Sequence, residues 1–226
     1  MSTTFAAFVT LIQNEINDVD ASMKTRIEGW TNDRHHEICS SRKWNWLEAV
    51  SDSTAIAANP LDIATGLKVA TVTTEARNVL DVIDASASPY QPLYPTTVDA
   101  VRASYQNWSA YTGTPTHWYL LSSTKLYLFP APAASRNYTV RFTKASQSYT
   151  TGSTTALLIP DRWIEVLKEA VLAKAKRWQD KPQEMALHEQ YFQNAMARMK
   201  SQDGEEAPII YNQKTYPFSI LPKASV

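Results

Sequence analysis

The chain has 226 residues, with 22 basic and 22 acidic side chains, only 19% charged residues, 7 Trp and 11 Tyr. The formal net charge of zero provides no global field that would draw the chain onto nucleic acid or an anionic membrane. The single cysteine, Cys39, excludes an intramolecular disulfide. Many aromatic and few charged residues are typical of interface cores, although a large aromatic core within one chain would have the same composition.

The N-terminal residues "MSTTFAAFVTLIQNEIND" lack a basic region and a small-residue cleavage site, so we expect no secretory signal. No run approaches 18 uninterrupted apolar residues, so we expect no membrane span.

Two helices are predicted first. Apolar residues at three- and four-residue spacing predict the first helix, and they are Phe5, Phe8, Val9, Ile12, Ile16 and Val19. Either Asp20 or Ser22 can cap a second helix, which we expect to end near "SSRKW". Its buried face is predicted to contain Met23, Ile27, Trp30 and Ile38.

A β-rich module is predicted next. The segments "LKVATVTT" and "NVLDVIDA" are short and partly alternating, as in strands. "TTVDAVRASYQNW" predicts a short helix with Thr96 as its cap. Three strands are predicted near residues 118–120, 126–128 and 138–142, with "SST" and "PAPAASRN" as the turns between them.

A tight αα-hairpin is predicted to follow. Asp161 can cap its first helix, which we expect to run to about Asp180. Lys181 precedes Pro182 and therefore avoids the α region, whereas Pro182 suits the first turn of a new helix. The second helix is predicted to run to about Gln202, and to contact the first through Met185, Phe192, Met196 and Met199.

These elements predict an α+β, mainly α fold. A helical bundle would consist of the N-terminal helix pair and the αα-hairpin, at residues 1–45 and 156–203. A small antiparallel β module would be inserted at residues 46–155, and residues 204–226 would form an extended C-terminal tail. Each of these boundaries is an expectation from local patterns.

The first helix of the hairpin has a wide apolar face. Its apolar residues spread over roughly 200° of the helical wheel, whereas a surface helix needs about 100°. Either the N-terminal helices of the same chain cover this arc, or one flank packs against a neighbouring copy. Lys174 and Arg177 lie inside the arc, where long side chains suit a subunit boundary. The candidate subunit-interface residues are Trp163, Val166, Ala170, Ala173, Lys174, Arg177 and Trp178.

The C-terminal tail is rich in apolar residues and has no helical period. Disordered tails are normally poor in such residues. Extended apolar segments often bind a partner by strand addition or by filling a groove, although this tail could also wrap back over its own core. The candidate binding residues are Ile209, Ile210, Tyr211, Tyr216, Phe218, Ile220 and Leu221.

Patterns typical of enzymes are missing from the sequence. The five glycines are scattered, so no phosphate-binding or dinucleotide loop is predicted. His36 and Cys39 are three residues apart, which is a partial metal geometry without further ligands at suitable spacing. We therefore expect no catalytic residues, no metal and no cofactor, and a protein that is not an enzyme.

The order of these parts resembles the head–tail adaptor (connector) proteins of tailed bacteriophages. "GTPTHWYLLSSTKLYLFPAP" is similar to a β-hairpin of that family, and "IPDRWIEVLKEAVLAKAKRWQDKPQEMALHEQYFQNAMARM" is similar to its closing αα-hairpin. The N-terminal helix pair before an inserted β region also matches. The resemblance covers roughly residues 1 to 203, with the proline of "LYLFPAP" and the "QDKPQE" turn as its best individual matches.

The resemblance implies a structural virion protein, made in the host cytoplasm and located in the neck at the head–tail interface. Such adaptors form a homo-oligomeric ring, typically of twelve copies, beneath the dodecameric portal protein. The far side of the ring receives a stopper, nozzle or other tail protein during tail assembly. DNA passes through the lumen during ejection without sequence-specific binding. In several members a C-terminal extension binds the portal, so the tail residues named above are the expected portal-binding residues.

Two other functions stay open from the residues themselves. An accessory binding module could use Trp118, Tyr119 and Tyr127 of the β module to hold a glycan or a peptide. A hydrolase without a recognisable motif could use His36 or Cys39.

Overall fold

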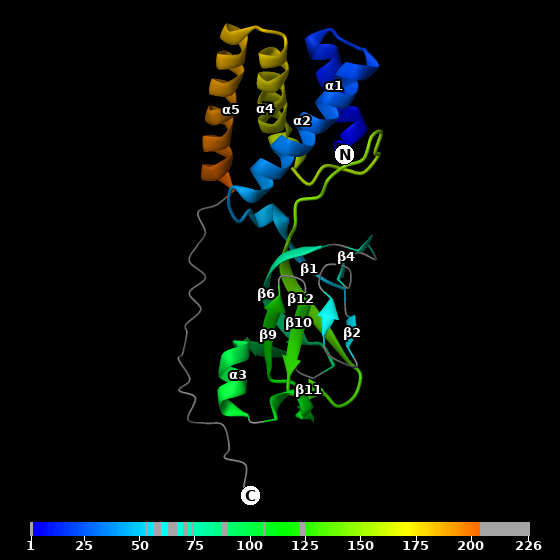
Figure 1. The fold of residues 1–226 in the computed structure, drawn as a ribbon, viewed down its shortest axis with the longest axis vertical. Coiled ribbons are helices and arrows are strands. Elements are labelled where there is room, and N and C mark those ends of the chain that lie inside the picture. Colours follow the sequence, from blue (N-terminus) through cyan, green and yellow to red (C-terminus); the bar gives the residue numbers. More distant parts are fainter. Residues whose placement is uncertain are drawn as a thin grey trace, which may run out of the picture.

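Two lobes lie one above the other along the long axis of the molecule, a helical lobe and a β lobe (Figure 1). The computed structural model describes residues 2–52, 54–56, 60–62, 67–69, 72–73, 75–86, 90–105, 107–122 and 125–203. The core of the helical lobe draws on residues 5–47 and 149–199, and that of the β lobe on residues 56–142. These limits fall near the predicted division at residues 46 and 155, but the division into these domains stays a prediction.

The N-terminal helices are α1 (Phe5–Ile16) and α2 (Ala21–Ser40). Asn17 ends α1 in the left-handed conformation with φ 54°, so the chain turns before it reaches Val19. The inclusion of Val19 in the apolar stripe was therefore wrong, and its side chain is 79% exposed. Asp20 is the cap of α2, because its carboxylate accepts a hydrogen bond from the Ser22 amide over 2.9 Å.

The C-terminal hairpin consists of α4 (Ile164–Trp178) and α5 (Pro182–Gln202). Asp161 was wrongly predicted to cap α4, since a 3-10 turn, η3 (Asp161–Trp163), comes before the helix. The Asp161 carboxylate instead accepts hydrogen bonds of 2.7 Å from the Thr3 amide and hydroxyl. Asp180 takes a positive φ of 56° between the two helices, and Pro182 occupies the first turn of α5 as predicted.

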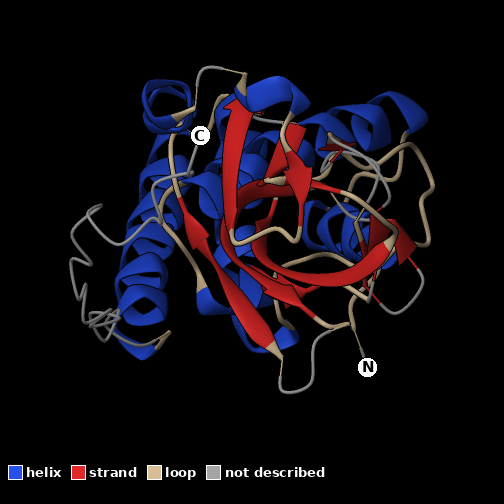
Figure 2. Ribbon diagram, turned by 90° about the horizontal axis from the view of Figure 1, so that it is seen from below, coloured by secondary structure: helices blue, strands red, loops and turns tan. Residues whose placement is uncertain are grey.

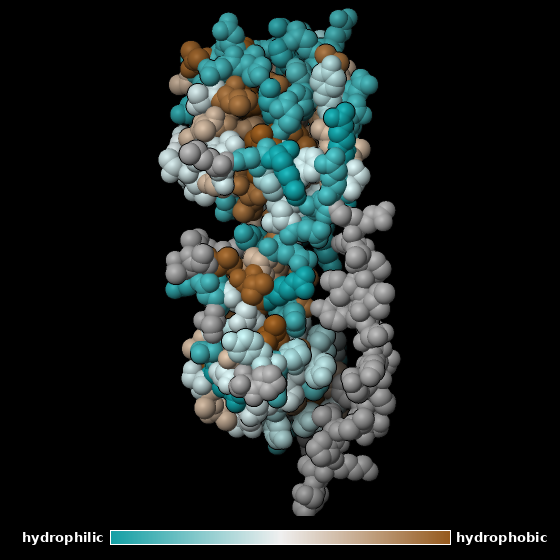
Figure 3. Space-filling view, turned by 180° about the vertical axis from the view of Figure 1, so that it is seen from behind, coloured by the Kyte–Doolittle hydropathy of each residue, from teal (hydrophilic) through white to brown (hydrophobic). Residues whose placement is uncertain are grey.

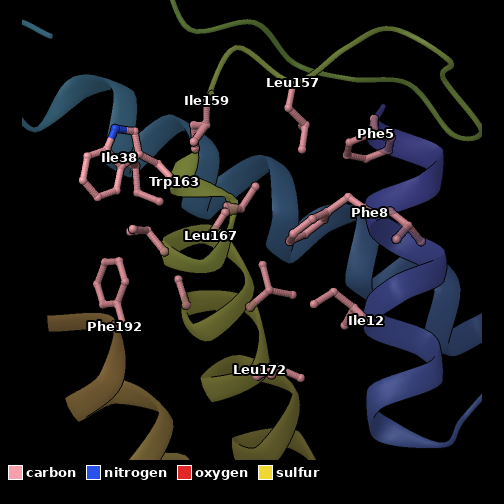
Figure 4. Packing of buried hydrophobic residues seen from close by; sticks show 14 of the residues in the cluster. Phe5, Phe8, Ile12, Ile38, Leu157, Ile159, Trp163, Leu167, Leu172 and Phe192 are labelled. Atoms are coloured by element: carbon pink, nitrogen blue, oxygen red, sulfur yellow. The ribbon is translucent and has the colours of Figure 1, made fainter. Parts of the chain in front are cut away.

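Helix α4 is the centre of the helical lobe. It contacts α1, α2 and α5, and Figure 4 shows Phe8 and Ile12 of α1 and Phe192 of α5 pointing toward it from opposite sides. Leu167 of α4 is fully buried. Helix α2 runs obliquely across the lobe (Figure 1), and the predicted bundle of the N-terminal helix pair and the αα-hairpin stays a prediction.

The β lobe contains an eight-stranded sheet in the order β1-β12-β6-β7-β9-β10-β3, with β2 also paired to β12. Its strands are β1 (Glu48–Val50), β2 (Thr54–Ile56), β3 (Leu61–Asp62), β6 (Ala76–Asp84), β7 (Gln91–Pro95), β9 (His117–Ser122), β10 (Lys125–Phe129) and β12 (Arg136–Lys144). Pairing is antiparallel except between β7 and β9. Figure 2 shows that the sheet curls strongly, so its inner face encloses a core of its own.

Two small strand pairs flank this sheet. They are β4 (Lys68–Val69) with β5 (Val72–Thr73), and β8 (Thr112–Gly113) with β11 (Ala131–Pro132). The segment "PAPAASRN" was wrongly predicted as a turn between neighbouring strands. It contains β11, and it links β10 to β12, which lie apart in the sheet order. Local sequence does not reveal which strands become neighbours.

Short helices complete the β lobe. Helix α3 (Val98–Ser104) follows β7, and its cap is Thr97 and not the predicted Thr96, since the Thr97 hydroxyl accepts a hydrogen bond from the Ala100 amide. The 3-10 turn η2 (Trp108–Ala110) also lies in the β lobe, whereas η1 (Asn45–Leu47) belongs to the helical lobe, with Leu47 in its core. Strands make up 27% of the residues that the structure describes, so the fold is mixed α/β with a larger β part than the predicted mainly α fold.

Candidate functional site

The predicted subunit-interface residues on α4 divide into two groups. Four of them are at most 9% exposed, within the core of their own chain, and they are Trp163, Val166, Ala170 and Ala173. Lys174 is half-buried, whereas Arg177 and Trp178 are exposed at the end of the helix. The wide apolar arc of α4 is therefore covered largely by α1, α2 and α5 of the same chain. A role of these residues between subunits stays a prediction.

Trp178 is the largest exposed member of this set, at 49%. The guanidinium of Arg26 on α2 lies 5.1 Å from the centre of its ring, within the range of a cation–π contact. This contact ties the end of α4 to the start of α2 and leaves the rest of the indole accessible.

Further exposed apolar side chains lie on the two outer helices of the lobe. Leu11 on α1 is 39% exposed, and Leu187 and Tyr191 on α5 are 45% and 48% exposed. None of the three was predicted as an interface residue. For Leu187 and Tyr191 the available signal was their place outside the α5 stripe of Phe192, Met196 and Met199, which is buried in the helical lobe. Figure 3 shows hydrophobic patches on both lobes, each framed by hydrophilic residues.

Charge is distributed unevenly at the end of the helical lobe where α1 and α4 finish. The α4–α5 turn and its approach, residues 174–181, contain four basic residues and one acidic residue. The α1–α2 connection and its approach, residues 15–20, contain three acidic residues and no basic one. Ion pairs partly neutralise both regions, as between Glu184 and Lys176 at 2.6 Å, and between Glu15 and Lys168 at 2.7 Å. The Lys168 ammonium beside Glu15 lowers the pKa of that carboxyl.

The predicted portal-binding residues lie outside the part of the chain that the structure describes, and they are Ile209, Ile210, Tyr211, Tyr216, Phe218, Ile220 and Leu221. The described chain ends at Asp203, which is 6% exposed. Asp203 lies between the lobes, where it accepts a hydrogen bond from the amide of Asn45. The described part of the chain therefore ends at the junction of the two lobes.

The aromatic residues proposed for glycan or peptide binding are mostly covered. Trp118 and Tyr119 are 7% and 2% exposed. The ring of Tyr119 stacks on that of Tyr127, with the ring centroids 5.3 Å apart, and the Trp108 ring meets the Tyr119 ring edge-on. Burial raises the pKa of Tyr119. A sugar needs an open aromatic face, so these residues act in the core of the β lobe and the structure does not favour that function.

His36 and Cys39, the pair considered for metal binding or hydrolysis, contact different neighbours. Cys39 is buried, and desolvation raises the pKa of its thiol to about 12, so the reactive thiolate is strongly disfavoured. Its neighbour is the buried His35, with its Nε2 3.7 Å away. His36 instead lies with its Nδ1 2.5 Å from the Ser146 hydroxyl. Among the described residues, no group of three or more potential metal ligands is present.

Two shallow hollows lie on the surface of the described residues. One, of about 430 Å³, lies in the β lobe beside Ser86, Gly113, Ser135 and Arg136. Arg136 is engaged there by the buried Asp84 carboxylate at 2.8 Å. The other, of about 540 Å³, lies along α1 and is lined by Ala7, Thr10, Leu11, Asn14 and Glu15. Both hollows are open to solvent, and their linings are better suited to protein contact than to enclosing a small substrate.

Comparison with known proteins gives one result that covers both lobes. None of the helices that the structure describes has the length and apolarity needed to cross a membrane. No curated protein matches the chain. The family model described as SU10 adaptor protein matches residues 3–212. The match spans α1 through α5. The hollows and exposed apolar side chains on the described surface are consistent with a protein that assembles with other proteins. The chain therefore belongs to the SU10 adaptor protein family, which is a family of phage head–tail adaptors.

Proposed function

We propose that this phage structural protein forms a ring beneath the portal, binds a stopper, nozzle or other tail protein on its far side, and lets DNA pass through its lumen. The family match over residues 3–212 carries this proposal. A formal net charge of zero is compatible with a DNA conduit, because DNA must slide through it without tight phosphate contacts. Twelve copies would match a dodecameric portal.

The tail is the proposed portal-binding segment. Seven large apolar or aromatic residues between Ile209 and Leu221 offer anchors for a groove or a sheet edge on the portal. The described chain ends at Asp203 beside Asn45 at the lobe junction, and this segment follows it in the sequence. Because ordering a free segment costs conformational entropy, we expect the isolated protein to be a monomer or a weak oligomer until the portal is present.

Truncation after Gly204 tests the portal assignment. The truncated protein should keep its circular dichroism spectrum and lose binding to the cognate portal, measured by co-sedimentation and negative-stain imaging. A matched pair of full-length variants refines the test. Tyr216→Ala with Phe218→Ala should weaken binding at least tenfold, whereas Glu205→Ala with Glu206→Ala should change it little. Truncated protein that binds the portal as tightly as the full chain would overturn the tail assignment.

A further inference from the structure

The two edges of the helical lobe have complementary features. Helices α1, α4 and α5 form a layer in which α4 lies between the other two (Figures 1 and 4). Helix α1 therefore presents one edge of the layer, and α5 presents the opposite edge. In one chain these edges cannot meet, because α4 separates them.

Apolar side chains on the two edges lie at matching heights. The α1–α2 connection and the α4–α5 turn are both at the same end of the lobe (Figure 1). At a rise of about 1.5 Å per residue, Leu11 and Ala7 lie about 8 and about 14 Å from the end of α1 at Ile16. Leu187 and Tyr191 lie about 8 and about 14 Å from the start of α5 on the same scale. The α1 edge is hollowed beside Leu11 and Ala7, whereas Leu187 and Tyr191 are large exposed side chains.

Charges at the end of the lobe are complementary as well. Arg177 and Lys181 are exposed beside the start of α5. Glu15, Asp18 and Asp20 lie at the end of α1. If two copies stand side by side with their long axes parallel, the basic turn of one meets the acidic connection of the next. The same placement brings Leu187 and Tyr191 over the hollow beside Leu11.

We infer that the α5 edge of one copy docks on the α1 edge of the next copy. A contact between two different surfaces of the same chain is heterologous, and when its rotation closes it generates a ring. This inference rests on the proposed function, and it names the surfaces that neighbours in the ring share. A single helix–helix contact is smaller than the roughly 800 Å² per partner of a stable interface, so the contact needs the portal as a template.

Disulfide cross-linking on the portal tests the contact. Full-length protein carrying both Leu11→Cys and Tyr191→Cys should give a ladder of dimers, trimers and larger species under mild oxidation. Each single variant should give no ladder, because a head-to-tail contact joins different residues. The matched control combines Leu11→Cys with Leu121→Cys, which places the second thiol at an equally exposed position of the β lobe and should give no ladder. The native Cys39 is buried and should not contribute.

The outcomes separate this inference from the proposed function. Rings on the portal without a ladder would overturn the α1–α5 contact and leave the proposed function standing. A ladder at high concentration without portal binding would support the contact and overturn the portal role. Neither rings nor a ladder would overturn both.

A charge reversal provides a second measurement. Arg177→Glu should weaken ring assembly by about threefold to tenfold, as expected for an exposed charge pair replaced by a repulsive one. Adding Asp18→Arg should restore assembly, because it recreates an attractive pair with the reversed sign. Loss that Asp18→Arg does not restore would contradict the pairing of these two ends.

Discussion

The Asn45 amide donates a hydrogen bond of 2.9 Å to the Asp203 carboxylate, which joins the end of α5 to the connector that enters the β lobe. The Asn45 side-chain amide also donates to the Asp203 carbonyl oxygen, at 2.5 Å. Asp203 is buried, and the Arg42 guanidinium donates to the nearby Lys200 carbonyl. The C-terminal end of the helical lobe is thereby attached to the connector between the lobes, next to the start of the proposed portal-binding tail.

Replacing Asp203 tests this attachment. Asp203→Ala removes a charged acceptor and leaves the Asn45 amide without it, which should lower the free energy of unfolding by about 1.5–3 kcal/mol. Asp203→Asn keeps one side-chain oxygen and should cost less. Urea denaturation measures both, and an Asp203→Ala protein within about 0.5 kcal/mol of the original would contradict a structural role for the bond.

The β lobe should depend strongly on Arg136. Asp84 is 1% exposed and accepts hydrogen bonds from the Arg136 Nε at 2.9 Å and the Ser86 amide at 2.9 Å. Arg136→Met would leave a buried carboxylate without its cation, which should lower the free energy of unfolding by about 2–4 kcal/mol. This value is at the lower end of the range for buried ion pairs because Arg136 is partly exposed.

Arg141 is the matched control for that change, on the same strand. It pairs with Glu48 at 2.6 Å, with both side chains about one-third exposed, so Arg141→Met should cost no more than about 1 kcal/mol. Equal losses in the two variants, measured by thermal unfolding, would argue against the special importance of the Asp84 pair.

Stability should fall as the pH is lowered through the titration of His35. Burial lowers the pKa of His35 from 6.5 to about 4, so between these values the unfolded chain binds a proton that the folded chain does not. The contribution of neutral His35 to the free energy of unfolding is therefore complete above pH 6.5, and it is lost as the pH falls toward 4. Between pH 7.5 and pH 5 the expected loss from this group is about 2 kcal/mol.

One variant isolates that contribution. His35→Gln removes the titrating group and should flatten the dependence of unfolding free energy on pH over this range. An unchanged slope in His35→Gln would assign the pH dependence to other groups.

The inner and outer parts of α4 should respond differently to substitution. Ala170 is fully buried, so Ala170→Leu should overpack the core and cost about 1–3 kcal/mol. Arg177 is exposed, and Arg177→Glu should change the unfolding free energy by less than about 0.5 kcal/mol. If Ala170→Leu instead leaves the monomer as stable and blocks ring assembly, Ala170 belongs to the subunit contact.

Local patterns were sufficient for most helices and for several strands. Asp20 holds the start of α2, and Pro182 begins α5. These features depend on residues within one turn of each other, so spacing predicts them well. Strands β9, β10 and β12 were also predicted from their alternating residues. Thr96 and Asp161 failed as predicted caps, because a cap depends on the backbone geometry of the preceding residues.

Sequence by itself determined most helices, several strands, the absence of an intramolecular disulfide and a resemblance that the family match bears out. Only the tertiary structure decided that α1, α2 and α5 cover most of the apolar arc of α4, and that Trp118 and Tyr119 lie inside the β lobe. It also placed Leu11 and Tyr191 on opposite edges of one layer. The physical reason is that a periodic pattern reveals which side of an element is apolar, whereas the chain's long-range packing decides which neighbour covers that side.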